Sequence, residues 1–126
     1  MFARDLANER ADELHPARLE EVARGVAAEV GAGVYVVSCE ELLEKGLHLL
    51  HAVGQSSRYG PRYVELTHTG DPEHPNDVIL IVGKGITFDS GGLNIKPTGS
   101  MEDMHMDMGG RCVPFAALAS LNSHNR

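Results

Sequence analysis

The chain has 126 residues, enough for one ordinary domain that buries roughly two-thirds of the surface exposed by its unfolded form. Hydrophobic residues make up 42% of it, which excludes a disordered chain, and its net charge of −7 gives no attraction to nucleic acid or anionic lipid. No apolar run approaches the ~20 residues of a membrane span, and the N-terminus lacks the apolar core of a signal peptide. We therefore expect a cytoplasmic globular protein that binds neither nucleic acid nor membrane.

The first half of the chain predicts a helix, a strand and a second helix. Residues 16–30 carry apolar side chains at helical spacing, with Pro16 suited to the first turn and Gly31 to the stop. Residues 34–37 form a β-branched and aromatic run typical of a strand. Residues 40–50 predict a helix that is broken near Gly46.

The second half changes character. Residues 63–68 alternate as a strand with one wet face would, and the following residues to Asp77 are rich in turn formers. Residues 78–82, VILIV, are apolar on both faces and predict a strand buried in the middle of a sheet. From Gly83 to Gly110 the chain is glycine-rich and aperiodic, as functional loops often are, and residues 115–121 predict a short helix. Helices and strands alternate, which predicts an α/β fold.

Four charged residues in the glycine-rich stretch suggest metal chemistry: Lys84, Asp89, Lys96 and Asp107. They follow a predicted buried strand, and ligands gather at the carboxyl ends of such strands. A desolvated, neutral Lys84 could ligate a cation, and Asp89 could bridge two ions. Two metals ~3.5–4 Å apart can ionise a shared water near neutral pH, while a charged Lys96 could stabilise the oxyanion formed on a substrate carbonyl.

Spacing alone leaves other interpretations open. A lysine and an aspartate among glycines are commonly part of an ordinary solvated turn. The Gly-Lys-Gly sequence at residues 83–85 also suggests a phosphate-binding loop, although the G-x-x-x-x-G-K-[ST] pattern is absent. Cys39 and Cys112 form no CxxC pair, so we expect two reduced thiols, with a single disulfide as the alternative.

Two long strings resemble a known family. The string GKGITFDSGGLNIKP, from Gly83 to Pro97, resembles a signature of the leucyl aminopeptidase family of two-metal exopeptidases, and MEDMHMDMGG resembles that family's second signature. Upstream, ARDLANERADELHPARL and AVGQSS are also similar to the family. The resemblance runs from about Arg4 to Gly110, and more loosely to Ala119.

The resemblance implies a role for each matched residue. Lys84 and Asp107 are implied as ligands of the tightly held metal and Asp89 as the ligand that bridges both metals. Lys96 resembles the catalytic lysine that polarises the peptide carbonyl, and Met104 a methionine lining the substrate pocket. The family does not use the position of His105, and Glu102 and Asp103 are expected to face solvent.

At the level of the whole protein, the resemblance implies a three-layer α/β/α fold with a mixed central sheet, as in zinc-dependent exopeptidases. It implies two divalent ions (zinc or manganese, with magnesium or cobalt as options), peptide substrates trimmed at N-terminal residues such as leucine, a cytoplasmic location and a hexameric assembly. On this basis residues 1–126 are expected to be a partial catalytic domain, with an incomplete fold.

The chain also departs from the family. The family completes its metal site with an Asp and a Glu well downstream, but no acidic residue follows Gly110 here, and Pro114 interrupts a segment that the family makes helical. Two functions therefore stay open. One is a two-metal aminopeptidase. The alternative is a truncated, non-catalytic fragment that binds metal weakly or only assembles with other chains. From residues 1–126 alone we expect no peptidase activity.

Overall fold

The computed structural model describes residues 2–104 and 109–121, apart from the side chains of Arg111 and Leu121. The chain divides into two compact units. One comprises His15–Asp77, and the other combines Met1–Leu14 with Val78–Arg126. Each unit is compact by itself.

Helix α2 (Pro16–Val30) is the longest element of the first unit, and it has the predicted bounds. His15 caps its N-terminus, because its Nδ1 accepts a hydrogen bond from the Arg18 amide at 3.2 Å. Gly31 ends the helix in the left-handed conformation at φ 69°, which glycine adopts without steric cost. The buried face consists of Leu19, Ala23, Val26 and Ala27.

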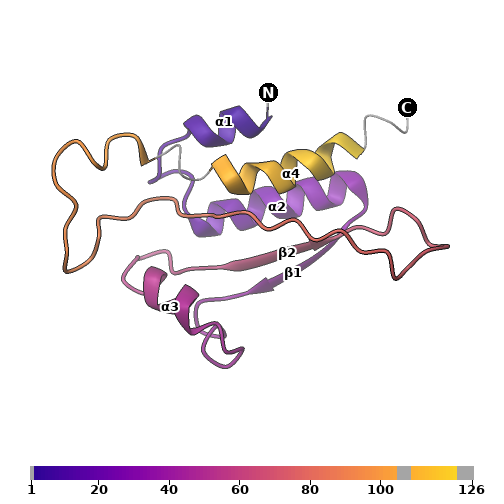
Figure 1. Cartoon of the computed structure of the whole chain (residues 1–126), viewed down its shortest axis with the longest axis horizontal. Helices are drawn as coiled ribbons and strands as arrows, with labels where there is room; N and C mark the ends of the chain where they lie inside the picture. Colours follow the sequence, from indigo (N-terminus) through magenta and orange to yellow (C-terminus); the bar gives the residue numbers. More distant parts are fainter. Residues whose placement is uncertain (1, 105–108, 122–126) are drawn as a thin grey trace. The chain divides into compact units, whose positions relative to one another are not determined.

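Two antiparallel strands, β1 (Gly33–Val37) and β2 (Tyr63–Thr67), form the sheet of this unit and contact α2 (Figure 1). Their register pairs Val34 with Leu66 and Val36 with Val64, so these apolar side chains share one half-buried face. The other face is exposed at Tyr35 and Glu65, as the alternating sequence predicts. Both predicted strands are therefore confirmed, and so is the α/β class.

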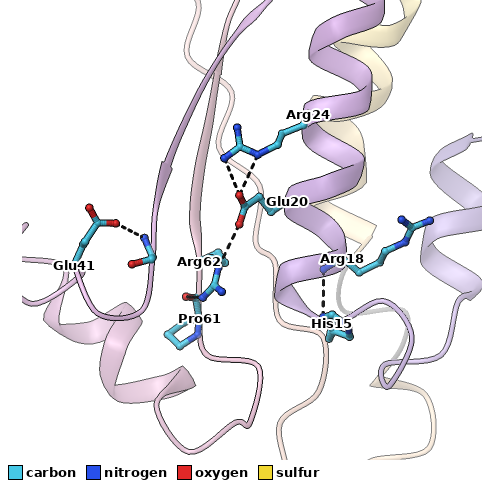
Figure 2. Close-up of polar contacts among 8 residues, drawn as sticks. His15, Arg18, Glu20, Arg24, Glu41, Pro61 and Arg62 are labelled. Atoms are coloured by element: carbon cyan, nitrogen blue, oxygen red, sulfur yellow. Dashed lines mark hydrogen bonds and ion pairs between the residues drawn. The ribbon is translucent and has the colours of Figure 1, made fainter.

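A charged cluster joins α2 to the segment before β2. Glu20 accepts hydrogen bonds from Arg24, one turn later in α2, with the shortest at 2.7 Å. The same carboxylate accepts from the Arg62 Nε at 3.3 Å, across 42 positions of sequence (Figure 2). Because the Arg62 and Glu20 side chains are 21% and 22% exposed, the pair is screened less than a fully exposed ion pair, and it links α2 to the residue before β2.

The connection between the strands differs from the prediction. Residues 39–46 form consecutive turns rather than a helix, and α3 (His48–Gly54) begins only afterwards. The Glu41 carboxylate accepts from the Ser38 amide at 3.0 Å and holds the first turn (Figure 2). Gly46 at φ 73° interrupts the helical path, so the predicted break at this residue is confirmed although the helix before it is not.

In the second unit, α1 (Phe2–Asn8) contacts α4 (Gly109–Leu121). Leu6, Cys112 and Phe115 are buried there. Helix α4 is longer than the predicted 115–121 and continues through Pro114, whose missing N–H leaves the Gly110 carbonyl without its helical donor. No disulfide joins Cys39, which is half-buried, to Cys112, which is buried, in the described part of the chain.

The expected buried strand at residues 78–82 is the main error of the sequence-based prediction. The segment is not a strand, and its five apolar residues are 51–88% exposed. A central strand needs hydrogen-bonded strands on both sides, whereas the strand pairing seen in the described ranges 2–104 and 109–121 joins only β1 to β2.

In the part of the chain that the structure describes, no helix has the length and apolar character that a membrane-spanning helix needs.

Candidate functional site

Asp89 and Lys96 meet in the glycine-rich loop. The Lys96 ammonium donates to Asp89 Oδ2 at 2.8 Å and to the Asp89 backbone oxygen at 3.1 Å. The other carboxylate oxygen, Oδ1, accepts from the Gly91 amide at 2.8 Å. The two predicted site residues are thus in direct contact, and the carboxylate is held from both sides.

The loop backbone explains why these side chains meet. The Lys96 amide donates to the Ser90 carbonyl at 2.9 Å and closes the loop at its base. Gly91 has φ 96°, and a Cβ on it would lie 2.3 Å from the Asn94 carbonyl oxygen, closer than real atoms approach. Only glycine allows this approach, so Gly91 is needed to bring Lys96 back to Asp89. The prediction had not identified it as a site residue.

The charges around Asp89 keep it ionised. The Lys96 hydrogen bond is the main reason that the pKa of Asp89 lies below its usual value, and the Gly91 amide lowers the pKa further. Desolvation opposes these two hydrogen bonds, and the positive charges of Lys96 and Lys84 lower the pKa by smaller amounts. Asp89 is therefore an anion at neutral pH, as a metal ligand must be.

Lys84 lies beside the start of α4. A Cβ on Gly110 would come within 3.6 Å of the Lys84 backbone nitrogen and oxygen, which is ordinary van der Waals contact. The Lys84 side chain is exposed, contrary to the expected desolvation. Its exposure follows from the open segment before it, because no strand ladder buries residues 78–82.

Glu102 orders the turn that follows Lys96. Its carboxylate accepts from the Gly99 amide at 2.9 Å and from the Met101 amide at 3.1 Å. The backbone hydrogen bond of Glu102 itself, followed by those of Gly99 and Met101, lowers the pKa of Glu102. The side chain is exposed as expected, but it also has a structural role. The sequence offered a signal for that role in the turn formers Pro97 and Gly99 before an acidic residue.

Of the remaining residues considered in the prediction, the structure describes Met104 but not Asp107 or His105. Met104 is buried, with 9% of its surface exposed. Asp107 and His105 lie outside the described residues. No α-helix opens between Gly83 and Met104, so the helix terminus that a phosphate-binding loop needs is missing from this stretch.

The fit of these residues to a divalent cation is partial. Asp89 offers an ionised carboxylate whose oxygens each keep a lone pair beyond the one used by Lys96 or Gly91. Within the described part of the chain, no group of three or more His, Cys, Asp or Glu side chains is placed to hold a metal. Lys84 is the other described residue that was predicted as a ligand, and its charge already acts on Asp89.

Comparison with known proteins shows which family the chain, including its glycine-rich loop, resembles. Residues 1–125 match the catalytic domain of the cytosol aminopeptidase family. The chain belongs to this family, so the resemblance to the leucyl aminopeptidases is confirmed.

Several relatives show how much of the protein is matched. The chain is 41% identical over 121 residues to a probable cytosol aminopeptidase of Desulfovibrio desulfuricans, covering 96% of the chain and 24% of that relative. It is 42% identical over 124 residues to a probable cytosol aminopeptidase of Chlamydia muridarum, covering 95% of the chain and 25% of the relative. The chain thus spans about a quarter of the length of these curated relatives.

Solved structures of two similar enzymes superpose on nearly the whole chain. The bottromycin maturation enzyme BotP in complex with Mn superposes with a TM-score of 0.85 at 44% identity, over 98% of this chain and 26% of BotP. The leucyl aminopeptidase from Leishmania major in complex with actinonin superposes with a TM-score of 0.83 at 33% identity, over 98% of this chain and 23% of that one. The α/β fold of the chain is therefore a part of the fold of these larger enzymes.

Proposed function

We propose that residues 1–126 are part of the catalytic domain of a metal-dependent aminopeptidase. This enzyme removes N-terminal residues, such as leucine, from peptides through a water activated by two metal ions. The observation that carries the proposal is the contact of Lys96 with Asp89 at 2.8 Å, inside the loop that matches the family. The relatives named as cytosol aminopeptidases, and the Mn bound by BotP, support the same conclusion.

Each residue has a proposed task. Asp89 would be a ligand shared by the two ions, and Lys84 and Asp107 would be further ligands of the tighter site. Asp107, which lies outside the described residues, is included because its position matches the family's second signature. Zinc or manganese, with magnesium or cobalt as options, would when bound supply an ionised water and a Lewis acid for the scissile carbonyl. Lys96 donates hydrogen bonds to the oxyanion, and Met104 lines the pocket for the first side chain.

The remaining ligands are proposed to come from outside residues 1–126. A divalent ion takes several oxygen or nitrogen ligands, and Lys84, Asp89 and Asp107 are too few for two ions. The matched relatives are about four times as long as the chain, which leaves room for these ligands elsewhere. The whole protein is proposed to act in the cytoplasm as a hexamer on peptide substrates.

The alternative is a non-catalytic fragment that binds metal weakly or only assembles with other chains, and the exposed apolar run at residues 78–82 favours it for this length of chain. Release of leucine from a leucyl chromogenic substrate, with added Mn²⁺, separates the two. We expect no turnover from the 126-residue chain, and turnover from a longer protein that contains it. Turnover by the short chain would contradict the proposed origin of the missing ligands.

The ligand assignment has its own test. Asp89→Asn keeps the shape of the side chain but removes its charge, so Mn²⁺ binding measured by calorimetry should fall below detection. Asp103→Asn, an equal change of charge at an exposed position of the same loop, is the control and should leave binding unchanged. Equal Mn²⁺ affinity in wild type and Asp89→Asn would remove Asp89 from the metal site.

A further inference from the structure

The side chain that caps α2 is a histidine. The Nδ1 atom of His15 accepts a hydrogen bond from the Arg18 amide at 3.2 Å (Figure 2). An imidazole nitrogen accepts a hydrogen bond only while it carries no proton, so this cap requires an unprotonated Nδ1. Ser, Thr and Asn, which are common at this position, have oxygen acceptors that take up no proton between about pH 5 and 8. The start of α2 therefore depends on the protonation state of one ring.

The first turn of α2 offers little compensation for the loss of this cap. It contains no acidic side chain, so no carboxylate there offsets the partial positive charge at the N-terminus of the helix. Glu20 and Glu21, the next acidic residues of the helix, are each already paired with arginine side chains. Protonation of His15 would remove the acceptor of the Arg18 amide and would place a full positive charge beside the amides of the first turn.

The ring of His15 is held in place by Tyr59, in the turn before β2. The two rings are stacked, with centroids 3.7 Å apart and planes 8° from parallel. Both residues are half-buried, so the stack restricts rotation of the imidazole on either side. It keeps Nδ1 beside the Arg18 amide and joins the start of α2 to the residues that lead into β2.

A second cation is already in contact with this stack. The Arg58 guanidinium lies 4.6 Å from the centre of the Tyr59 ring and donates a hydrogen bond to the Tyr59 hydroxyl. A protonated His15 would gain a cation–π contact with Tyr59, but Arg58 already uses the same ring, and the two cations would repel each other. On the side of the helix, the nearest charged group is Arg18, which is also a cation and is paired with Glu21. These neighbours do not make up for the lost cap.

We infer that His15 is a pH-sensitive N-cap, which holds the start of α2 while Nδ1 is unprotonated and releases it when the ring is protonated. Histidine is the side chain that ordinarily changes its charge between about pH 5 and 8. The capped, folded chain excludes a proton that the unfolded chain takes up, so stability should rise with pH through this range and fall as the pH is lowered. The groups involved all belong to residues 15–77, so the inference is independent of the proposed function.

The main experiment is urea denaturation of the full chain, followed by far-UV circular dichroism, at about pH 8 and about pH 5. His15→Asn supplies a cap that does not titrate, and His15→Phe keeps an aromatic ring for Tyr59 but has no acceptor. From the higher to the lower pH, the folding equilibrium constant of the wild type should fall about fivefold relative to that of His15→Asn, because one N-cap is lost. His15→Phe should be about fivefold less stable than His15→Asn at both pH values.

The other histidines do not affect this comparison. Their contributions, including that of His74, whose Nδ1 lies 2.7 Å from Asp71 Oδ2, are the same in wild type and His15→Asn and cancel in the difference. His48→Asn changes an exposed histidine of the same unit and should keep the wild-type pH dependence. Parallel loss of stability in wild type and His15→Asn would overturn the inference, and this comparison decides alone if His15→Phe does not fold. A folded His15→Phe that keeps the wild-type pH dependence would also overturn it.

A second measurement locates the effect at the start of the helix. Hydrogen exchange of the Arg18 amide, corrected for the intrinsic effect of pH, should lose protection in the wild type as the pH is lowered, but not in His15→Asn. The Ala32 amide, which donates to the Ala27 carbonyl at 2.9 Å at the other end of α2, should keep its protection in both. Protection of the Arg18 amide that stays constant with pH in the wild type would overturn the inference.

Discussion

Two regions of the molecule differ in whether their apolar side chains are buried. One is the layer of α2, β1 and β2, and the other is the segment of residues 78–95, which contains Asp89. In the layer, Leu19, Val26 and Val37 are buried, and each element has a partner that covers it. In the segment, residues 78–82 are exposed, and so are Phe88, Leu93 and Ile95. The comparison shows that the layer is stabilised by packing within its own unit, whereas the site loop is held by hydrogen bonds within the loop.

The largest expected effect compares one substitution in the turns at residues 39–46, in the unit that contains the layer, with the same substitution in the segment. Leu42 is 0% exposed and Leu80 is 81% exposed. Leu42→Ala should lower the free energy of unfolding by about 3 kcal/mol, because it removes buried methyl groups and leaves a cavity. Leu80→Ala should change it by less than about 0.5 kcal/mol, because its side chain is already in water. Urea denaturation followed by far-UV circular dichroism measures both, and equal losses would mean that residues 78–82 pack as tightly as the layer.

A smaller effect tests the loop itself with two neighbouring glycines. Gly91→Ala places a methyl group 2.3 Å from the Asn94 oxygen, whereas a Cβ at Gly92, φ 67°, meets nothing within 4 Å. Gly92→Ala should cost about 1 kcal/mol of left-handed strain, and Gly91→Ala about 1–3 kcal/mol with a rearranged loop. Amide hydrogen exchange at Lys96 reports the outcome, because its bond to Ser90 closes the loop. Exchange should accelerate strongly in Gly91→Ala only, and similar rates in both variants would rule out the close approach as the cause.

These regions also separate what the sequence could predict from what it could not. Helix α2 carries its own periodicity, proline start and glycine stop, and the alternation in β2 specifies its wet face, so both were correctly located. Residues 78–82 are apolar on both faces, which suits a central strand. The sequence of these five residues does not say which neighbouring strands would form hydrogen bonds with them, because other parts of a protein must supply those strands. The turns at 39–46 follow from the Glu41 contact with the Ser38 amide, a local bond that helical composition conceals.

The site was predictable to a similar degree. The family signature predicts Asp89 and Lys96 as site residues, and the structure places these two side chains in contact. It gave no reason to single out Gly91, whose role depends on how close the Asn94 carbonyl comes to it, a backbone geometry that composition does not specify. Nor could it reveal that Lys84 would be exposed, because exposure depends on what covers the preceding segment.

The smallest expected effect is the pH dependence that Asp89 confers on the loop. Its pKa is depressed in the folded chain, chiefly by Lys96, relative to the ordinary value of about 3.9 expected for the unfolded chain. The unfolded chain therefore binds more protons in the window between these two values, and stability rises with pH there. The contribution is complete above the ordinary aspartate pKa and is lost as the pH falls through the depressed one. Because the pair is solvent-exposed, its contribution should be much smaller than the effect of Leu42→Ala.

Lys96→Met isolates this effect. Removing the ammonium should raise the pKa of Asp89 toward its usual value, while the Gly91 amide keeps part of the depression. Nuclear magnetic resonance titration of the Asp89 side-chain carboxyl carbon measures the shift, and Lys45→Met serves as the control for net charge. A pKa of Asp89 that is the same in wild type and Lys96→Met would mean that the two side chains do not pair in solution. The loop would then have to hold its carboxylate through the Gly91 amide alone.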